Sequence, residues 1–317
     1  MEKYPVTPAH LRDLRVGNAA GTIKTLEQVA RACASKTLTD VTVGSVTLEE
    51  CVGNVGTTYA FDRETGTSVN ALGLPNRGLR WYIEHLPDMR MLATASKKRL
   101  RVSIAGFSPQ EYGIIARRVR YAGADEIEVN LACPNVWSAD GKQKPIVSYD
   151  PEAVSIVLGE VRRCIGASVP IAVKISPVPD TVLPDLLDAI VKSDIVTHVV
   201  AVNTLPNQRL LIQERPALRF RAHDAPEDAP WNEVGGGAGA LLADECRRVV
   251  GYFCKHLPIG IKVIAVGGIM DGADAAEVIS DGACGFQCAT AYLEGDGPRA
   301  MSRILEEFVA LISETAE

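Results

Sequence analysis

The sequence lacks long apolar runs and an excess of positive charge. No stretch of its 317 residues approaches the roughly 18 uninterrupted apolar residues of a membrane span, and the first residues contain no apolar core of signal-peptide length. Thirty-three Lys and Arg stand against 39 Asp and Glu, giving a formal net charge of -6. This balance argues against nucleic acid or an anionic membrane as a partner. We therefore expect a cytoplasmic protein that acts on small molecules.

Motifs for metal binding and for disulfide frameworks are also missing. The five histidines form no HExxH motif and no pair at ligand spacing, so no metal site is predicted. The eight cysteines include no CxxC pair and no iron-sulfur spacing, which favours reduced thiols in a cytosolic enzyme. Internal repeats and domain boundaries are absent, and we expect one domain over residues 1–317.

The chain does contain a regular alternation of short β-rich runs with helical patterns. Eight strands are expected at residues 16–21, 40–44, 101–105, 126–131, 171–175, 198–203, 262–266 and 285–289. Helices are expected at residues 109–122, 151–165, 182–192, 240–256, 272–281 and 297–312. This count predicts an α/β fold, a (β/α)8 TIM barrel whose active site lies at the carboxyl ends of the strands. Residues 48–84 and 206–233 fit no simple βα unit and are expected to form long active-site loops.

Polar residues gather at the predicted strand ends, where a core would have none. Amide side chains stand at or beside these ends, together with a lysine and a cysteine; the residues are Asn70, Asn130, Asn135, Asn203, Thr204, Lys174 and Cys133. One Asn at a strand end is commonly a cap. Several on one face of a barrel, however, predict a site that holds a planar ligand through amide hydrogen bonds.

Two further patterns predict a phosphate-bearing cofactor. Lys174 interrupts an apolar strand, where its ammonium needs an anionic or accepting partner such as a reduced flavin. Glycines cluster in the last third, in the loop 235–239 that precedes a helix and in Gly267 and Gly268 after the seventh strand, and the eighth strand ends at Ala289 and Thr290. Loops after the seventh and eighth strands are the usual phosphate site of such barrels.

These segments together resemble the dihydroorotate dehydrogenase family over nearly the whole chain. The resemblance is carried by residues 18–21, 43–47, 70–76, 103–106, 130–135, 173–174, 202–204 and the glycine segments. It implies an FMN-dependent barrel that oxidises (S)-dihydroorotate to orotate in de novo pyrimidine synthesis. A cysteine at position 133 is similar to the soluble class 1 enzymes, whereas the membrane-bound class carries serine.

The resemblance also implies roles for individual residues. Cys133 would be the base that removes the proton from C5 while hydride leaves C6 for flavin N5. Orotate would contact Lys24, Asn70, Asn130, Asn135, Asn203 and Thr204. The FMN contacts would be Ala20, Gly21, Ser45, Asn130, Lys174, Gly236, Gly237, Gly267, Gly268, Ala289 and Thr290. The loop 136–148 is expected to close over Cys133 and exclude water.

The sequence departs from the class 1 pattern at three positions. Gly44 stands where class 1 enzymes carry a substrate-contacting lysine, and Lys24 falls where the membrane-bound class places its equivalent lysine. Ala132 replaces a serine, and Ala289 replaces a frequent glycine. We therefore expect the ammonium that meets the orotate carboxylate to come from Lys24.

Other functions fit parts of the pattern. A related FMN-dependent oxidoreductase of another pyrimidine or alkene would keep the amides without needing Lys24. A catalytically silent phosphate-binding barrel would need no flavin, and a flavin-free phosphosugar enzyme would need an acid-base pair that the strand ends lack. Class resemblance further suggests fumarate as the electron acceptor and a homodimer.

Overall fold

The computed structural model describes residues 11, 13–133 and 145–314, and its centre is a closed barrel of eight parallel strands. The order around the barrel is β1-β16-β15-β9-β8-β7-β6-β2. These strands are β1 (Arg15–Asn18), β2 (Asp40–Val46), β6 (Arg99–Ile104), β7 (Glu126–Asn130), β8 (Ile171–Ile175), β9 (Val196–Ala201), β15 (Lys262–Val266) and β16 (Gly285–Cys288). The predicted (β/α)8 barrel is confirmed, and each of its eight strands overlaps a predicted one.

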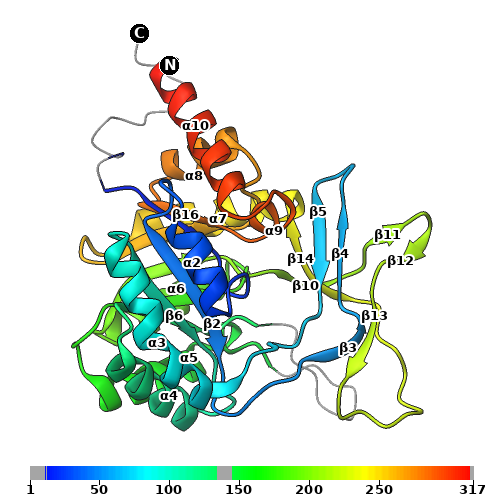
Figure 1. The fold of residues 1–317 in the computed structure, drawn as a ribbon, viewed down its shortest axis with the longest axis horizontal. Helices are drawn as coiled ribbons and strands as arrows, with labels where there is room; N and C mark the ends of the chain where they lie inside the picture. Colours follow the sequence, from blue (N-terminus) through cyan, green and yellow to red (C-terminus); the bar gives the residue numbers. More distant parts are fainter. Residues whose placement is uncertain (1–10, 12, 134–144, 315–317) are drawn as a thin grey trace.

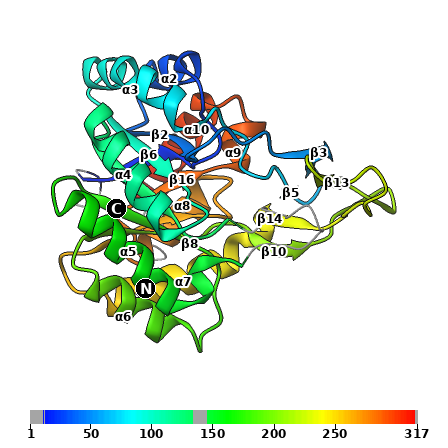
Figure 2. The same cartoon turned by 90° about the horizontal axis from the view of Figure 1, so that it is seen from below.

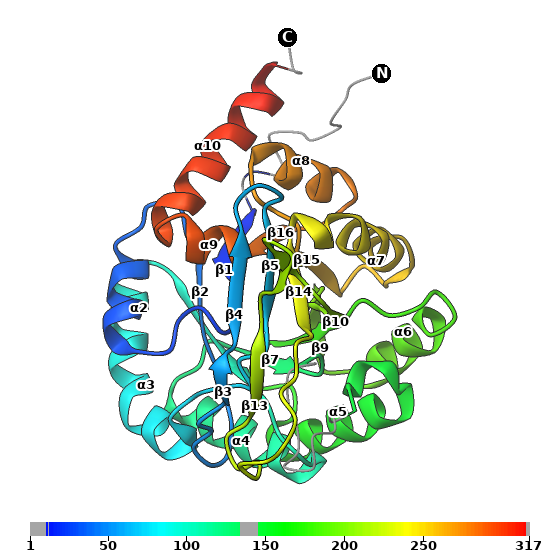
Figure 3. The same cartoon turned by 90° about the vertical axis from the view of Figure 1, so that its right-hand side faces the viewer.

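Helices surround the barrel and cover its apolar outer face (Figure 3). They are α2 (Leu26–Cys33), α3 (Gly78–Ala95), α4 (Pro109–Ala122), α5 (Pro151–Ile165), α6 (Leu183–Lys192), α7 (Ala243–His256), α8 (Gly272–Ser280), α9 (Thr290–Glu294) and α10 (Pro298–Glu314), with short 3-10 turns η1 (Val147–Tyr149) and η2 (Ala240–Leu242). Helices α4 and α5 have the predicted bounds because Ser108 and Asp150 cap their first turns and a proline follows each cap.

The two stretches expected as long loops form antiparallel strands instead. Residues 48–84 contain β3 (Asn54–Thr57), β4 (Tyr59–Asp62) and β5 (Thr67–Asn70), and residues 206–233 contain most of β10 (Leu205–Gln208), β11 (Leu211–Ile212), β12 (Arg215–Pro216) and β13 (Arg219–Ala222). Strands β4, β5 and β10 join β14 (Gly235–Gly239) in one sheet, while β13 pairs with β3. This sheet extends from the barrel in Figure 1 and Figure 2 and crosses in front of it in Figure 3.

The glycine-rich segment 235–239 is therefore not the loop that the sequence suggested. Strand β14 pairs with β5 on one side and β10 on the other, and its residues are buried. A β-carbon on Gly235 would lie 2.5 Å from the carbonyl oxygen of Asn70, so close approach of neighbouring strands explains the glycine there.

A network of buried charges fills the amino-terminal end of the barrel. Arg15 pairs with both Asp40 and Glu126, and Arg101 donates to Glu126 from Nε at 3.1 Å and from Nη2 at 2.9 Å. Burial alone would raise the pKa of both carboxyls, but the hydrogen bonds and charges of the two arginines hold the pKa of Asp40 below its usual value and that of Glu126 well below it. These paired charges define the floor of the barrel.

Candidate active site

A cavity lies between the carboxyl ends of the barrel strands and the antiparallel sheet. It encloses about 1130 Å³ of empty space, including open solvent at its mouth. The predicted site residues that line it are Ala20, Gly21, Lys24, Ser45, Asn70, Asn130, Cys133, Lys174, Asn203, Thr204, Gly267, Gly268, Ala289 and Thr290.

Three predicted site residues are not placed in this lining. Gly236 and Gly237 lie in β14, and it is the next two residues of that strand, Ala238 and Gly239, that face the cavity. Asn135 lies outside the described residues, as does most of the loop 136–148 that was expected to close over Cys133.

The amide of Asn130 is held in one orientation by its neighbours. Its Nδ2 donates to Ser45 Oγ at 3.0 Å, and its Oδ1 accepts from the backbone N–H of Ala132 at 3.1 Å and from Asn203 Nδ2 at 3.4 Å. Asn203 is fixed in turn, because its Oδ1 accepts from the backbone N–H of Thr204 at 2.8 Å. Two amides at the ends of β7 and β9, the strands on either side of β8, are therefore oriented before any ligand arrives.

The loop that carries Lys24 is tied to the next barrel strand. Asn18 donates from Nδ2 to the carbonyl of Thr42 at 2.7 Å, and the backbone N–H of Gly21 donates to the carbonyl of Gly44 at 2.6 Å. The Lys24 backbone N–H donates to Gln28 Oε1 at 2.7 Å beside the capping box of α2. Burial lowers the pKa of Lys24, and the charge of Cys51 partly opposes this shift. Its ammonium is thus half-buried in the wall of the cavity.

Lys174 occupies the inner end of the cavity. Its side chain comes from β8 inside the barrel and is 4% exposed. Burial lowers the pKa of Lys174, the charge of Glu128 raises it, and Arg101 lowers it further. A ligand that gains negative charge above this ammonium would be stabilised by it.

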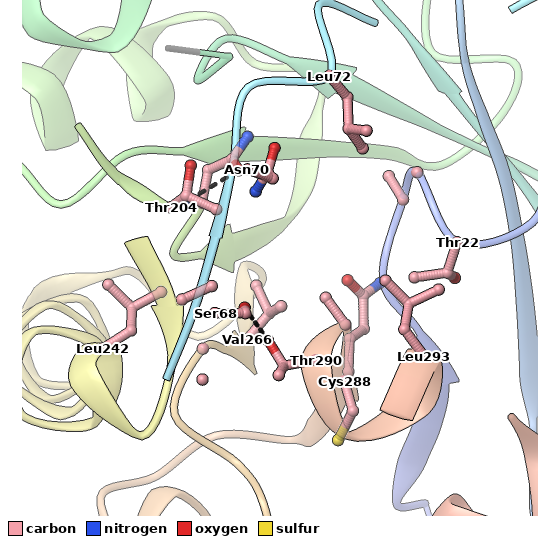
Figure 4. Close-up of a pocket in the computed structure, with 18 of the residues that line it drawn as sticks. Thr22, Ser68, Asn70, Leu72, Thr204, Leu242, Val266, Cys288, Thr290 and Leu293 are labelled. Atoms are coloured by element: carbon pink, nitrogen blue, oxygen red, sulfur yellow. Dashed lines mark hydrogen bonds between the residues drawn. The ribbon is translucent and has the colours of Figure 1, made fainter. Parts of the chain in front are cut away.

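The cavity also contains polar residues that the sequence reasoning missed. Ser68 on β5 shares a hydrogen bond of 2.8 Å with Thr290 at the start of α9, and this bond joins the covering sheet to the barrel (Figure 4). Thr22, Tyr59 and Gln287 line the wall as well. Gln287 could have been found, because it alternates with Gly285 on the inward face of a predicted strand.

Two buried oxygen atoms in the cavity lining are informative about the kind of ligand that the cavity can hold. Within the described part of the chain, Thr204 Oγ1 and Gln287 Oε1 have no hydrogen-bond partner, and both residues line the cavity. Buried polar atoms are rarely left unpaired, so these two indicate groups that a ligand satisfies. Gly267, Gly268 and the first turn of α9 form the far wall, where bare backbone suits a phosphate. The lining fits a planar, hydrogen-bonding cofactor with a phosphate tail.

The fold and the site define a (β/α)8 enzyme with an amide-rich cavity that contains a cysteine and two lysines. A family model described as dihydroorotate dehydrogenase matches residues 13–312. The chain belongs to the dihydroorotate dehydrogenase family, whose members are flavoprotein oxidoreductases acting on a CH–CH bond. The predictions of family and enzyme class are confirmed, and a catalytically silent barrel or a flavin-free phosphosugar enzyme is set aside.

Named relatives match almost the whole chain. A probable dihydroorotate dehydrogenase A (fumarate) of Streptococcus pneumoniae serotype 4 is 32% identical over 302 residues, which cover 94% of this chain and 89% of the relative. The dihydroorotate dehydrogenase A (fumarate) of Lactococcus lactis subsp. cremoris is 31% identical, with 94% and 90% covered.

A solved structure supports the fold alone. The crystal structure of DHODH in complex with ferulenol from Eimeria tenella has a TM-score of 0.77 at 20% identity and covers 95% of this chain and 82% of that one. No helix within the described ranges is long and apolar enough to cross a membrane.

Proposed function

We propose that the protein oxidises (S)-dihydroorotate to orotate with FMN as its bound flavin and fumarate as the electron acceptor. The observation that carries this proposal is that Cys133, Lys174 and the oriented amides of Asn130 and Asn203 line one cavity. The family match and the fumarate-specific names of the relatives support it. A cytoplasmic location and a homodimer remain predictions.

The chain would hold FMN along one side of the cavity. Lys174 would lie against the ring system, Ala20, Gly21 and Ser45 would flank it, and the backbone of Gly267 and Gly268 with Thr290 would face the phosphate. Bound FMN would accept the hydride that leaves C6 of the substrate.

The substrate would lie between the amides and the cysteine. Asn70, Asn130, Asn203 and Thr204 would hydrogen-bond the pyrimidine ring, and the Lys24 ammonium would meet its carboxylate. Cys133 would take the proton from C5 as the electron pair of that C–H bond forms the C5–C6 double bond. A proton thus leaves C5 and a hydride leaves C6, which together account for the two hydrogens and two electrons lost when a CH–CH bond is oxidised.

The first test is an anaerobic visible spectrum of the purified protein before and after addition of dihydroorotate. Yellow colour that bleaches on addition is expected, and fumarate should then restore the colour. Colour that persists would point to the related FMN-dependent oxidoreductase of another pyrimidine or alkene. A colourless protein that takes up no added FMN would contradict the proposal altogether.

A further inference from the structure

Glu128 is a buried carboxylate that the proposed reaction does not use. It lies on β7, two residues before Asn130, and is 0% exposed. Its Oε1 has no hydrogen-bond partner in the described part of the chain, and its Oε2 accepts only a long bond of 3.5 Å from Gln287 Nε2. A buried carboxylate with so little hydrogen bonding is stabilised by a cation beside it.

The charges below Glu128 are already committed to each other. Arg101 directs Nε and Nη2 to Glu126, and its remaining nitrogen, Nη1, stands 3.9 Å from Glu128 Oε2. Arg15 is taken up by Asp40 and Glu126. Arg99 also donates to Asp40, from Nε at 3.1 Å. Within the described part of the chain, the guanidinium groups at the barrel floor therefore direct their hydrogen bonds to Asp40 and Glu126, and Glu128 receives none from them.

The cation above Glu128 is Lys174. In the register of β7 and β8, Asn130 pairs with Lys174 and Glu128 pairs with Ala172. Glu128 therefore lies on the adjacent strand, two residues nearer than Lys174 to the amino-terminal end of the barrel. Both side chains are buried within the barrel, and Lys174 also lines the cavity. The charge of Glu128 raises the pKa of Lys174 against the lowering effect of burial, as expected for opposite charges on adjacent strands inside the barrel.

We propose that Glu128 is a positioning residue that supplies the buried counter-charge of Lys174 and so lowers the reduction potential of the bound flavin. The inference rests on the proposed function, because it requires a flavin above Lys174. A flavin gains negative charge on reduction, and a lone ammonium beneath it would favour the reduced form strongly. The Glu128 carboxylate reduces that positive potential, which makes the flavin easier to reoxidise by its acceptor.

The test is the flavin reduction potential of Glu128→Gln and of the wild type at pH 6. This pH lies about four units below the ordinary lysine pKa, which leaves a margin for Lys174 to stay protonated after its counter-charge is removed. The ratio of reduced to oxidised flavin at a fixed potential should rise about tenfold in the variant, or about 30 mV for a two-electron couple. Glu128→Asp, which keeps the charge, should stay near the wild type. If Glu128→Gln does not fold, Glu128→Met makes the same charge change at similar volume.

Two controls separate this role from others. Thr42→Val removes a buried hydroxyl that has no hydrogen-bond partner among the described residues, without changing charge, and the flavin potential of this variant should equal that of the wild type. In a Lys174→Met background, Glu128→Gln should shift the potential little, because Glu128 acts through the ammonium that this background lacks.

Each unfavourable outcome has a distinct meaning. An unchanged potential in a Glu128→Gln variant that binds flavin overturns the inference and leaves the proposed function intact. An equal shift with and without Lys174 also overturns it, because Glu128 would then act on the flavin directly. A wild-type protein that binds no flavin contradicts the proposed function instead.

Discussion

Gly44 stands so close to Ser103 that no side chain fits between them. A β-carbon on Gly44 would lie 2.4 Å from the Ser103 carbonyl oxygen and 2.9 Å from the backbone nitrogen of Val46. Its φ of +107° is also a conformation that side chains rarely adopt. The class 1 lysine expected at this position is therefore excluded by the backbone of β2 and β6, and Lys24 is the nearby ammonium that the cavity contains.

Replacing Gly44 should destabilise the barrel. We expect Gly44→Ala to lower the free energy of unfolding by about 1–3 kcal/mol, because it combines backbone strain with a clash against another strand. Urea unfolding followed by circular dichroism measures this. The matched control is Gly159→Ala in α5, where a β-carbon meets nothing within 4 Å and the helix should be unchanged or gain up to about 1 kcal/mol. Equal effects at both positions would contradict the steric argument.

Removing the Lys24 ammonium should weaken the use of dihydroorotate. We expect Lys24→Ala to lower kcat/KM roughly 30-fold, since loss of a charge-assisted bond to the substrate carboxylate costs about 2 kcal/mol. Steady-state kinetics with dihydroorotate measures the change, and the exposed Lys36 provides the control variant Lys36→Ala. Full kcat/KM in Lys24→Ala would show that another group binds the carboxylate and would favour a different substrate.

Removing the Cys133 thiol should slow proton transfer while leaving the ligands bound. Cys133→Ala is expected to lower kcat by about 10²–10⁴-fold, the usual contribution of a general base. Flavin content and orotate affinity, measured by absorbance titration, should stay close to the wild type. Cys164→Ala changes a thiol on the outer helix α5 and should keep full activity. A Cys133→Ala variant with normal kcat would remove the cysteine from the mechanism.

The barrel could be predicted from the sequence because its parts are local. Each strand is a short apolar run, and helices such as α4 begin at a side-chain cap followed by proline and end at a left-handed glycine, Gly123. Helix α3 was missed because it has no side-chain cap and contains Pro87. The covering sheet was missed because its pairing is long-range: β14 meets β5 across more than 160 residues.

The candidate site was predictable where polar residues interrupt a strand pattern, as Lys174 and Asn130 do. Ser68 and Tyr59 could not be assigned in this way, because they reach the cavity only through the covering sheet. Gly236 and Gly237 were expected to contact the FMN phosphate because glycine runs are typical of phosphate loops. Glycine runs also occur where strands pack closely, and the sequence alone does not distinguish the two. Pattern identifies the strand ends, but the tertiary pairing decides which residues face the ligand.

The buried network at the barrel floor should make the stability depend on pH. The folded-state pKa of Glu126 lies well below its unfolded value of about 4.3, so the ionised carboxylate stabilises the fold above that pH and this contribution is lost as the pH falls through the folded pKa. Glu126→Gln removes the carboxylate that pairs with both Arg15 and Arg101 and should cost about 3–5 kcal/mol at pH 7. Urea unfolding at pH 7 and pH 3 measures the free energy of unfolding, and the difference between wild type and Glu126→Gln should be smaller at pH 3.

The control variant is Glu84→Gln, which breaks an exposed pair with Arg80 and should cost about 0.5 kcal/mol or less at pH 7. If the difference in unfolding free energy between the wild type and Glu126→Gln is the same at pH 3 and pH 7, the charge of Glu126 does not contribute to stability. The effect of the substitution would then come from packing.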